Sequence, residues 1–124
     1  AYRCDPYALC KAEKLEKVLK DFPDLRICVP HLGFDETRAY RKLIDTYENL
    51  WLDTTMVITD YFQFQEKIDL GKYRPERIMY GSDFPNIPYA WDRELKVLDK
   101  AGISRDSMEK ICGGNAAAFY NISR

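Results

Sequence analysis

Three polar residues of this sequence, His31, Asp53 and Asp83, each stand at or just beyond the end of a short apolar segment. A neutral histidine can bind a metal ion, act as a general base or hydrogen-bond a bound water. An aspartate can ligate a divalent ion and accept a proton from a metal-bound water. These residue types therefore indicate metal-assisted chemistry, provided that the fold brings them together.

Each of the three residues also has a purely structural alternative. His31 can end a strand and satisfy a neighbouring carbonyl, and Asp83 can accept hydrogen bonds from Ser82 or from nearby amides. For Asp53 the functional interpretation is contact with a substrate, and the structural one is a cap of the turn that follows. Position alone does not separate these interpretations, so the elements that precede the residues matter.

The apolar pattern predicts alternating helices and strands. Asp5 and Pro6 suit the start of a first helix, which Pro23 ends. Short apolar segments bounded by breakers predict strands at 25–30, 50–53 and 77–81. Further helices are predicted at 36–47 with Asp35 as cap, 61–70, 90–100, 105–112 with Ser104 as cap, and 115–119 with Asn115 as cap.

Strands separated by helices pair in parallel through right-handed crossovers, which predicts an α/β fold. In such folds the ligand sites lie at the carboxyl ends of the strands. His31, Asp53 and Asp83 are all expected there. Arg74 and Arg77 precede the third strand, so we expect them at the opposite end, on solvated surface.

Composition limits the classes of function. The 124 residues are 46% hydrophobic and 31% charged, which is typical of one globular domain. A formal net charge of -1, without a basic block, argues against a nucleic-acid partner. The sequence has no apolar run long enough for a membrane span and no secretory signal. Four cysteines without a CxxC pair indicate reduced thiols in a cytoplasmic protein.

Five phrases of the sequence, read together, resemble one family. They lie at 22–27, 29–33, 49–55, 77–85 and 110–117, and the fourth contains Gly-Ser-Asp-Phe-Pro. In order and spacing they are similar to the amidohydrolase-related family, which includes the aminocarboxymuconate-semialdehyde and resorcylate decarboxylases and several lactone hydrolases. The resemblance implies the C-terminal half of a (β/α)8 TIM barrel, with three parallel strands corresponding to strands six to eight.

The resemblance also implies roles for two residues. In that family the aspartate of Gly-Ser-Asp-Phe-Pro binds a divalent metal, commonly zinc, and this role falls on Asp83. The sixth-strand histidine contacts the metal-bound water or the substrate, and this role falls on His31. Phe34 stands where a second glycine is common, so we expect a different loop shape there.

The family's other metal ligands are histidines on the first and fifth strands, and His31 is the only histidine here. A full barrel also needs about 250 residues. We therefore expect an incomplete domain, inactive in isolation, from a parent that is a metal-dependent hydrolase or decarboxylase. The parent would act on a small carboxylated or cyclic substrate, through a metal-activated water or a metal-bound substrate.

Two other interpretations stay open. One is a small doubly wound signalling or binding module with Asp53 as phosphate acceptor, although paired acidic residues after the first strand and a lysine after the last are lacking. The other is a non-catalytic half-barrel interaction protein.

Three strands alone also predict self-association. Alternation along the strands predicts an inner side of Ile27, Val29, Met79 and Gly81. The same alternation predicts that Cys28, Ile78 and Tyr80 face the helices. Without the other barrel strands the inner side is apolar and uncovered, and the sheet has two open edges. We therefore expect a homo-oligomer that covers this inner face.

Overall fold

The computed structural model describes residues 10–64 and 66–123. Within this part of the chain, three short parallel strands form one sheet in the order β1-β2-β3. Their bounds are Ile27–Val29, Leu50–Asp53 and Ile78–Met79. The α/β prediction is confirmed, and all three predicted strands are present, with the first and third shorter than expected.

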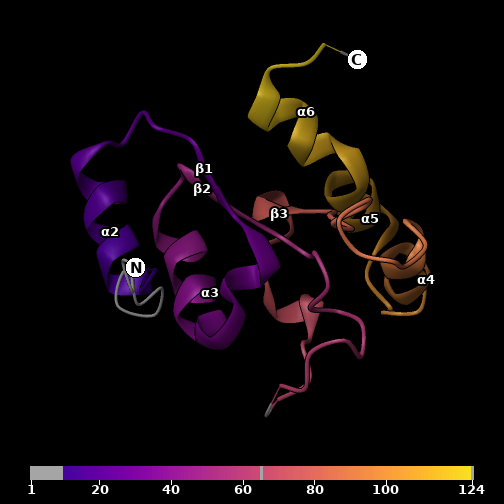
Figure 1. Cartoon of the computed structure of the whole chain (residues 1–124). Helices are drawn as coiled ribbons and strands as arrows, with labels where there is room; N and C mark the ends of the chain where they lie inside the picture. The colour runs from indigo at the N-terminus through magenta and orange to yellow at the C-terminus, as the bar shows by residue number, and fades with distance from the viewer. Residues whose placement is uncertain (1–9, 65, 124) are drawn as a thin grey trace.

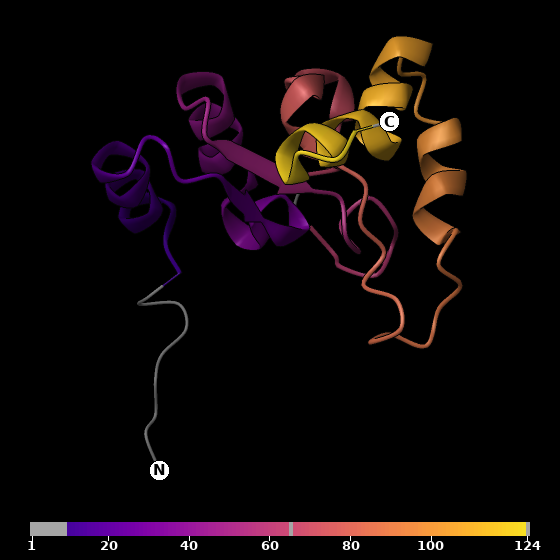
Figure 2. The same cartoon turned by 90° about the horizontal axis from the view of Figure 1, so that it is seen from above.

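Five α-helices accompany the sheet in the described residues. They are α2 (Ala12–Asp21), α3 (Thr37–Thr46), α4 (Arg93–Asp99), α5 (Arg105–Glu109) and α6 (Asn115–Tyr120). Figure 1 shows α2 and α3 beside β1 and β2, with α4, α5 and α6 gathered beyond β3. The view from above separates the same two groups (Figure 2). Among the described residues, no helix has the length and apolar character needed to cross a membrane.

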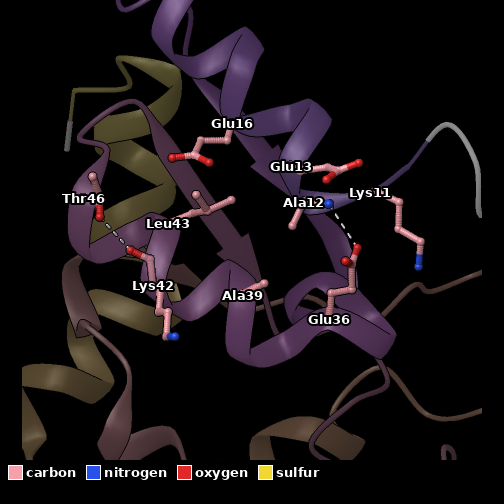
Figure 3. Close-up of a pocket in the computed structure, with 9 residues that line it drawn as sticks. All are labelled: Lys11, Ala12, Glu13, Glu16, Glu36, Ala39, Lys42, Leu43 and Thr46. Atoms are coloured by element: carbon pink, nitrogen blue, oxygen red, sulfur yellow. Dashed lines mark hydrogen bonds between the residues drawn. The ribbon is translucent and has the colours of Figure 1, made fainter.

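The start of α2 is held by a side chain from the segment before α3. The predicted start at Asp5 and Pro6 lies outside the described residues, and α2 begins at Ala12. The Ala12 N–H donates to Glu36 Oε2 over 3.0 Å, across an open groove of about 590 Å³ between the two helices (Figure 3). The predicted Asp35 cap of α3 is wrong, because the Asp35 carboxylate instead lies 3.7 Å from Lys11 Nζ.

The predicted helix at 61–70 is also wrong. The described residues between β2 and Leu70 form turns and irregular backbone. Phe62 and Phe64 both contact the Phe34 ring edge to face, with centroids 5.0 and 6.0 Å away. Residues two apart on a helix do not face the same side, so an irregular backbone is what lets both rings reach one neighbour.

The cap predicted at Ser104 is confirmed, since its hydroxyl accepts from the Ser107 N–H over 3.1 Å. The helix that it starts is shorter than 105–112, because α5 ends at Glu109 and a single π-helical turn, Lys110–Gly114, follows. The predicted Asn115 cap is wrong. Its buried amide donates to the carbonyls of Pro75 and Ile78 over 2.6 and 2.7 Å, which ties α6 to the start of β3.

The register of the sheet corrects the expected inner face. Ile27 and Val29 pair with Leu50 and Leu52 and pack against the core that the helices cover. Cys28 therefore points to the opposite face, together with its partner Trp51. The alternation inferred for the third strand holds, because Ile78 pairs with Leu52 and is fully buried in the core. For β1 the inferred alternation is wrong. It was counted back from His31, and His31 has a φ of 58°, so its backbone does not continue the extended strand.

The inner face is also better covered than expected. Met79 is 5% exposed and Trp51 is 7% exposed within a single chain. The centroid of the Phe119 ring of α6 lies 5.1 Å from that of the Trp51 ring. The Arg77 guanidinium lies 4.4 Å from the centroid of the Trp51 ring. Arg77 is thus not solvated surface, as its side chain is only 16% exposed. Five of the ten large exposed apolar residues in the described part of the chain lie in the segments that follow the strands: Phe34, Tyr61, Phe84, Tyr89 and Trp91.

Candidate functional site

The candidate site is built at the carboxyl ends of the three parallel strands. His31 follows β1 by two residues, Asp53 is the last residue of β2, and Asp83 lies four residues beyond the end of β3. Because the strands are parallel, these ends share one edge of the sheet. All three side chains are half-buried there.

Asp53 joins the ends of β1 and β2. Its Oδ1 accepts from the backbone N–H of Thr55 over 3.0 Å and from that of His31 over 3.1 Å. The first bond is the turn cap anticipated from the sequence. The second was not anticipated, and it fixes the backbone of His31 to the neighbouring strand.

The imidazole of His31 is held by one ring nitrogen. Nδ1 lies 2.9 Å from the carbonyl oxygen of Thr55. A carbonyl oxygen only accepts, so Nδ1 carries the proton and Nε2 carries the lone pair of the neutral ring. Nδ1 of His31 thus satisfies a neighbouring carbonyl, as the structural alternative expected. Nε2 is not used in this bond, so it can act as a base or as a metal ligand.

The end of β3 packs directly against this pair. A Cβ on Gly81 would lie 2.1 Å from Thr55 Oγ1 and 3.3 Å from the Asp53 carboxylate. The Gly81 N–H donates to Thr54 Oγ1 over 3.3 Å. Only glycine lets the third strand end this close to the second, and the Gly-Ser-Asp loop therefore starts beside Asp53.

Asp83 occupies a turn of its own. Its φ is 57°, its Oδ1 accepts from the Asn86 side-chain amide over 3.0 Å, and its carbonyl accepts from the Asn86 N–H over 2.8 Å. Ser82 caps Phe84 instead, through a 3.3 Å bond to its N–H. For the described part of the chain, no hydrogen bond joins Asp83 to His31. The structure thus brings His31 and Asp53 together, with Asp83 in a separate turn on the same edge.

The thiol of Cys28 is a poor nucleophile. Burial, and secondly the Asp53 carboxylate, raise the pKa of Cys28 to about 12. The thiol therefore stays protonated at neutral pH. A protonated thiol in this position behaves as a small apolar side chain. The described cysteines, Cys10, Cys28 and Cys112, are all free thiols.

The described residues suit a divalent ion in type but not in number. An imidazole nitrogen and a carboxylate oxygen are both ordinary zinc ligands, and zinc usually takes three or four from the protein. Within the described ranges, no group of three His, Cys, Asp or Glu side chains could hold a metal ion. These residues by themselves do not form a complete metal site.

Sequence reasoning missed Phe62 and Asn86, and it missed the main-chain role of Thr55. Thr55 acts through its carbonyl, and a main-chain acceptor leaves no mark in the residue type. Phe62 lies with its ring centroid 6.0 Å from the His31 ring, and its segment was wrongly predicted as helix. Asn86 binds Asp83, and the spacing of three residues within a Pro-containing turn could have indicated it.

Comparison with known proteins places the chain in a family. The amidohydrolase family profile matches residues 11–122. The chain therefore belongs to the amidohydrolase family, as the five phrases of the sequence indicated. Among curated proteins, none matches the sequence.

Solved structures show the same fold. An uncharacterised TIM-barrel protein from Bordetella bronchiseptica superposes with a TM-score of 0.77 at 20% identity, over 98% of this chain and 43% of its own. A zinc-bound amidohydrolase from Burkholderia multivorans gives 0.68 at 16% identity, over 90% and 49%. The 5-carboxyvanillate decarboxylase from Sphingomonas paucimobilis gives 0.56 at 21% identity, over 86% and 36%.

These matches define the fold as part of a TIM barrel. The chain spans less than half of the length of these three structures, at 43%, 49% and 36%. Membership of the amidohydrolase family argues against the doubly wound signalling module. The three parallel strands of this chain and their helices correspond to one section of a TIM barrel.

Proposed function

We propose that this chain is the C-terminal half of a metal-dependent amidohydrolase barrel, with β1, β2 and β3 as strands six to eight. The parent enzyme would be a hydrolase or decarboxylase that acts on a small carboxylated or cyclic substrate. The observation that carries the proposal is the 2.9 Å contact between His31 Nδ1 and the Thr55 carbonyl, which leaves Nε2 available at the carboxyl ends of the strands, where the Asp83 loop also lies. Barrel enzymes place their catalytic groups at this edge.

In this proposal Asp83 is a carboxylate ligand of a divalent ion, with zinc as the first candidate. The zinc-bound Burkholderia multivorans relative supports that choice. The remaining ligands would come from parts of the parent protein outside these residues. His31, through Nε2, would accept a hydrogen bond or a proton from a reacting water, or would orient the substrate.

Hydrolysis and decarboxylation both remain within the proposal. The family includes amidohydrolases, and one structural relative is a decarboxylase of an aromatic acid. The residues described here serve either reaction, since a fixed Nε2 can orient a water or a carboxylate group. The other strands of the parent barrel would decide between the two reactions.

The experiment uses a complete barrel that contains this sequence. His31→Asn should lower turnover about a hundredfold or more while most of the zinc stays bound. Asp83→Asn should lower both turnover and zinc content, because the amide keeps the shape but loses the charge. Zinc is measured by mass spectrometry after dialysis, and turnover with a panel of lactones and aromatic carboxylates.

Asp99→Asn on the exposed face of α4 is the matched control and should change neither quantity. Full activity and full zinc content in Asp83→Asn would remove Asp83 from the site. A complete barrel that binds no zinc and turns over none of the panel would contradict the proposal and would favour a non-catalytic role.

A further inference from the structure

One carboxylate controls both partners of the hydrogen bond that holds the His31 ring. Asp53 Oδ1 accepts from the His31 N–H over 3.1 Å and from the Thr55 N–H over 3.0 Å. The Thr55 carbonyl in turn lies 2.9 Å from His31 Nδ1. The imidazole and its acceptor are therefore both attached to Asp53 through their backbones.

The backbone at His31 needs such an anchor. His31 and Leu32 have φ values of 58° and 49°, in the left-handed region that side chains other than glycine disfavour. Residues stay in this region only where their surroundings hold them. Leu32 is held by complete burial. His31 is half-buried, so its bonds to Asp53 and Thr55 must do more of the holding.

The third strand leaves Asp53 little room to move. A Cβ at Gly81 would fall 3.3 Å from the Asp53 carboxylate, so the glycine backbone passes close to it. The charge of Asp53 also reaches Cys28 on the same face, where it contributes to the raised pKa of the thiol. Asp53 is thus confined between the ends of β1 and β3.

We infer that Asp53 is a positioning residue that fixes the tautomer of His31, with the proton on Nδ1 and the lone pair on Nε2. Asp53 needs no contact with substrate in this role. It acts through the backbone of His31 and through the Thr55 carbonyl. The inference rests on the proposed function only for the use of Nε2, because the tautomer itself is a property of this chain.

The tautomer can be measured directly, because His31 is the only histidine of the 124 residues. Nitrogen-15 shifts of histidine-labelled chain, at a pH where the ring is neutral, distinguish protonated Nδ1 from protonated Nε2. The wild-type chain should show mainly the Nδ1–H form. Asp53→Ala should lower the ratio of Nδ1–H to Nε2–H about fivefold or more, the effect of losing one net hydrogen bond.

Two further variants separate positioning from general stability. Asp53→Asn keeps the shape and an acceptor oxygen, so it should keep the fold and lower the ratio less than Asp53→Ala. Asp60→Ala, in the exposed segment after β2, should leave the ratio unchanged. Circular dichroism of each variant reports whether the fold is kept, and Asp53→Asn carries the test if Asp53→Ala unfolds.

A wild-type chain with mainly the Nε2–H form would overturn the inference. So would an unchanged ratio in both Asp53 variants. Neither result depends on catalysis, whereas the proposed function fails if His31→Asn and Asp83→Asn keep full turnover. The two failures are therefore distinguishable.

Discussion

Gly81 shows at the scale of one residue how closely the strand ends approach. The site of its absent Cβ is already filled by Thr55 Oγ1, 2.1 Å away. The Thr55 side chain has little room to turn away, because Thr55 is only 6% exposed, and its backbone is held by bonds to Asp53 and His31. The space beside Gly81 is thus part of the same arrangement that holds the imidazole.

Gly81→Ala is therefore expected to disturb both stability and the site. The added methyl must displace Thr55 or the end of β3, and overpacking of this kind costs about 1 to 3 kcal/mol of the free energy of unfolding. Chemical denaturation measures this loss. Displacing Thr55 should also lengthen its bond to His31, so the Nδ1–H form should fall in the same variant.

Gly71→Ala is the control for that prediction. A Cβ at Gly71 would lie 3.2 Å from the tip of the exposed Asp69 side chain, which needs to shift by only a few tenths of an ångström. Its effect should be well under that of Gly81→Ala. Equal effects of the two substitutions would mean that the contact between Gly81 and Thr55 is not tight.

The sequence predicted the residue types of the site better than their bonds. His31 and Asp83 were placed at strand ends because apolar segments precede them, and β1 and β3 confirm that placement. The turn cap by Asp53 also followed from local spacing. The His31 bonds did not, because they depend on how β1 and β2 align and on a backbone carbonyl at Thr55.

At the scale of elements, strands were predicted well and one helix was not. β2 matched its predicted bounds because a compact apolar segment ends at a polar residue. The segment at 61–70 has aromatic residues that suit a helix face as well as an irregular loop. Its packing on Phe34 is a tertiary contact, and a single sequence carries no sign of it.

An ion-pair network lies at the amino ends of the strands, and it leads to a prediction about how stability depends on pH. Glu48, in the turn before β2, receives hydrogen bonds from Arg74 over 2.6 and 3.0 Å and a further one from Arg77. These bonds, Arg74 first and Arg77 second, lower the pKa of Glu48 to about 2. They connect the turn after α3 to the segment before β3.

The lowered pKa of Glu48 determines whether the stability of the fold rises or falls with pH. Glu48 is more acidic in the folded chain than in the unfolded one, so its contribution is complete above pH 4.5 and is lost as pH falls towards 2. Because the carboxylate is 66% exposed, we expect only about 1 kcal/mol. Glu48→Gln should therefore destabilise the chain at pH 7, and the difference from wild type should shrink below pH 4.5.

Urea unfolding at several pH values measures that difference. Asp24→Asn, an exposed carboxylate in the turn before β1, is the control and should have no comparable effect. A Glu48→Gln deficit that stays constant from pH 7 to pH 3 would show that lost packing, rather than charge, is responsible.

At the scale of the whole molecule, two kinds of surface are exposed among residues 10–64 and 66–123. β1 and β3 are the two edges of the described sheet, and an open edge can pair with another chain. Large aromatic residues in the loops after the strands are also exposed, among them Phe84 at 59% and Trp91 at 58%. The expected apolar inner face is not among these surfaces, since Trp51 and Met79 are buried.

We therefore expect the chain to self-associate through the loops at the carboxyl ends of the strands. In a complete barrel these loops would surround the substrate, and in this chain their exposed aromatic residues can bury area against a second copy. Sedimentation equilibrium at micromolar concentration should show a dimer or a higher oligomer.

Phe84→Ser and Trp91→Ser should shift the equilibrium towards monomer, because each removes exposed apolar area from that end. Tyr120→Ser, which removes a side chain 64% exposed on α6, is the control and should leave the equilibrium unchanged. A stable wild-type monomer at these concentrations would show that the loop aromatics are covered within one chain.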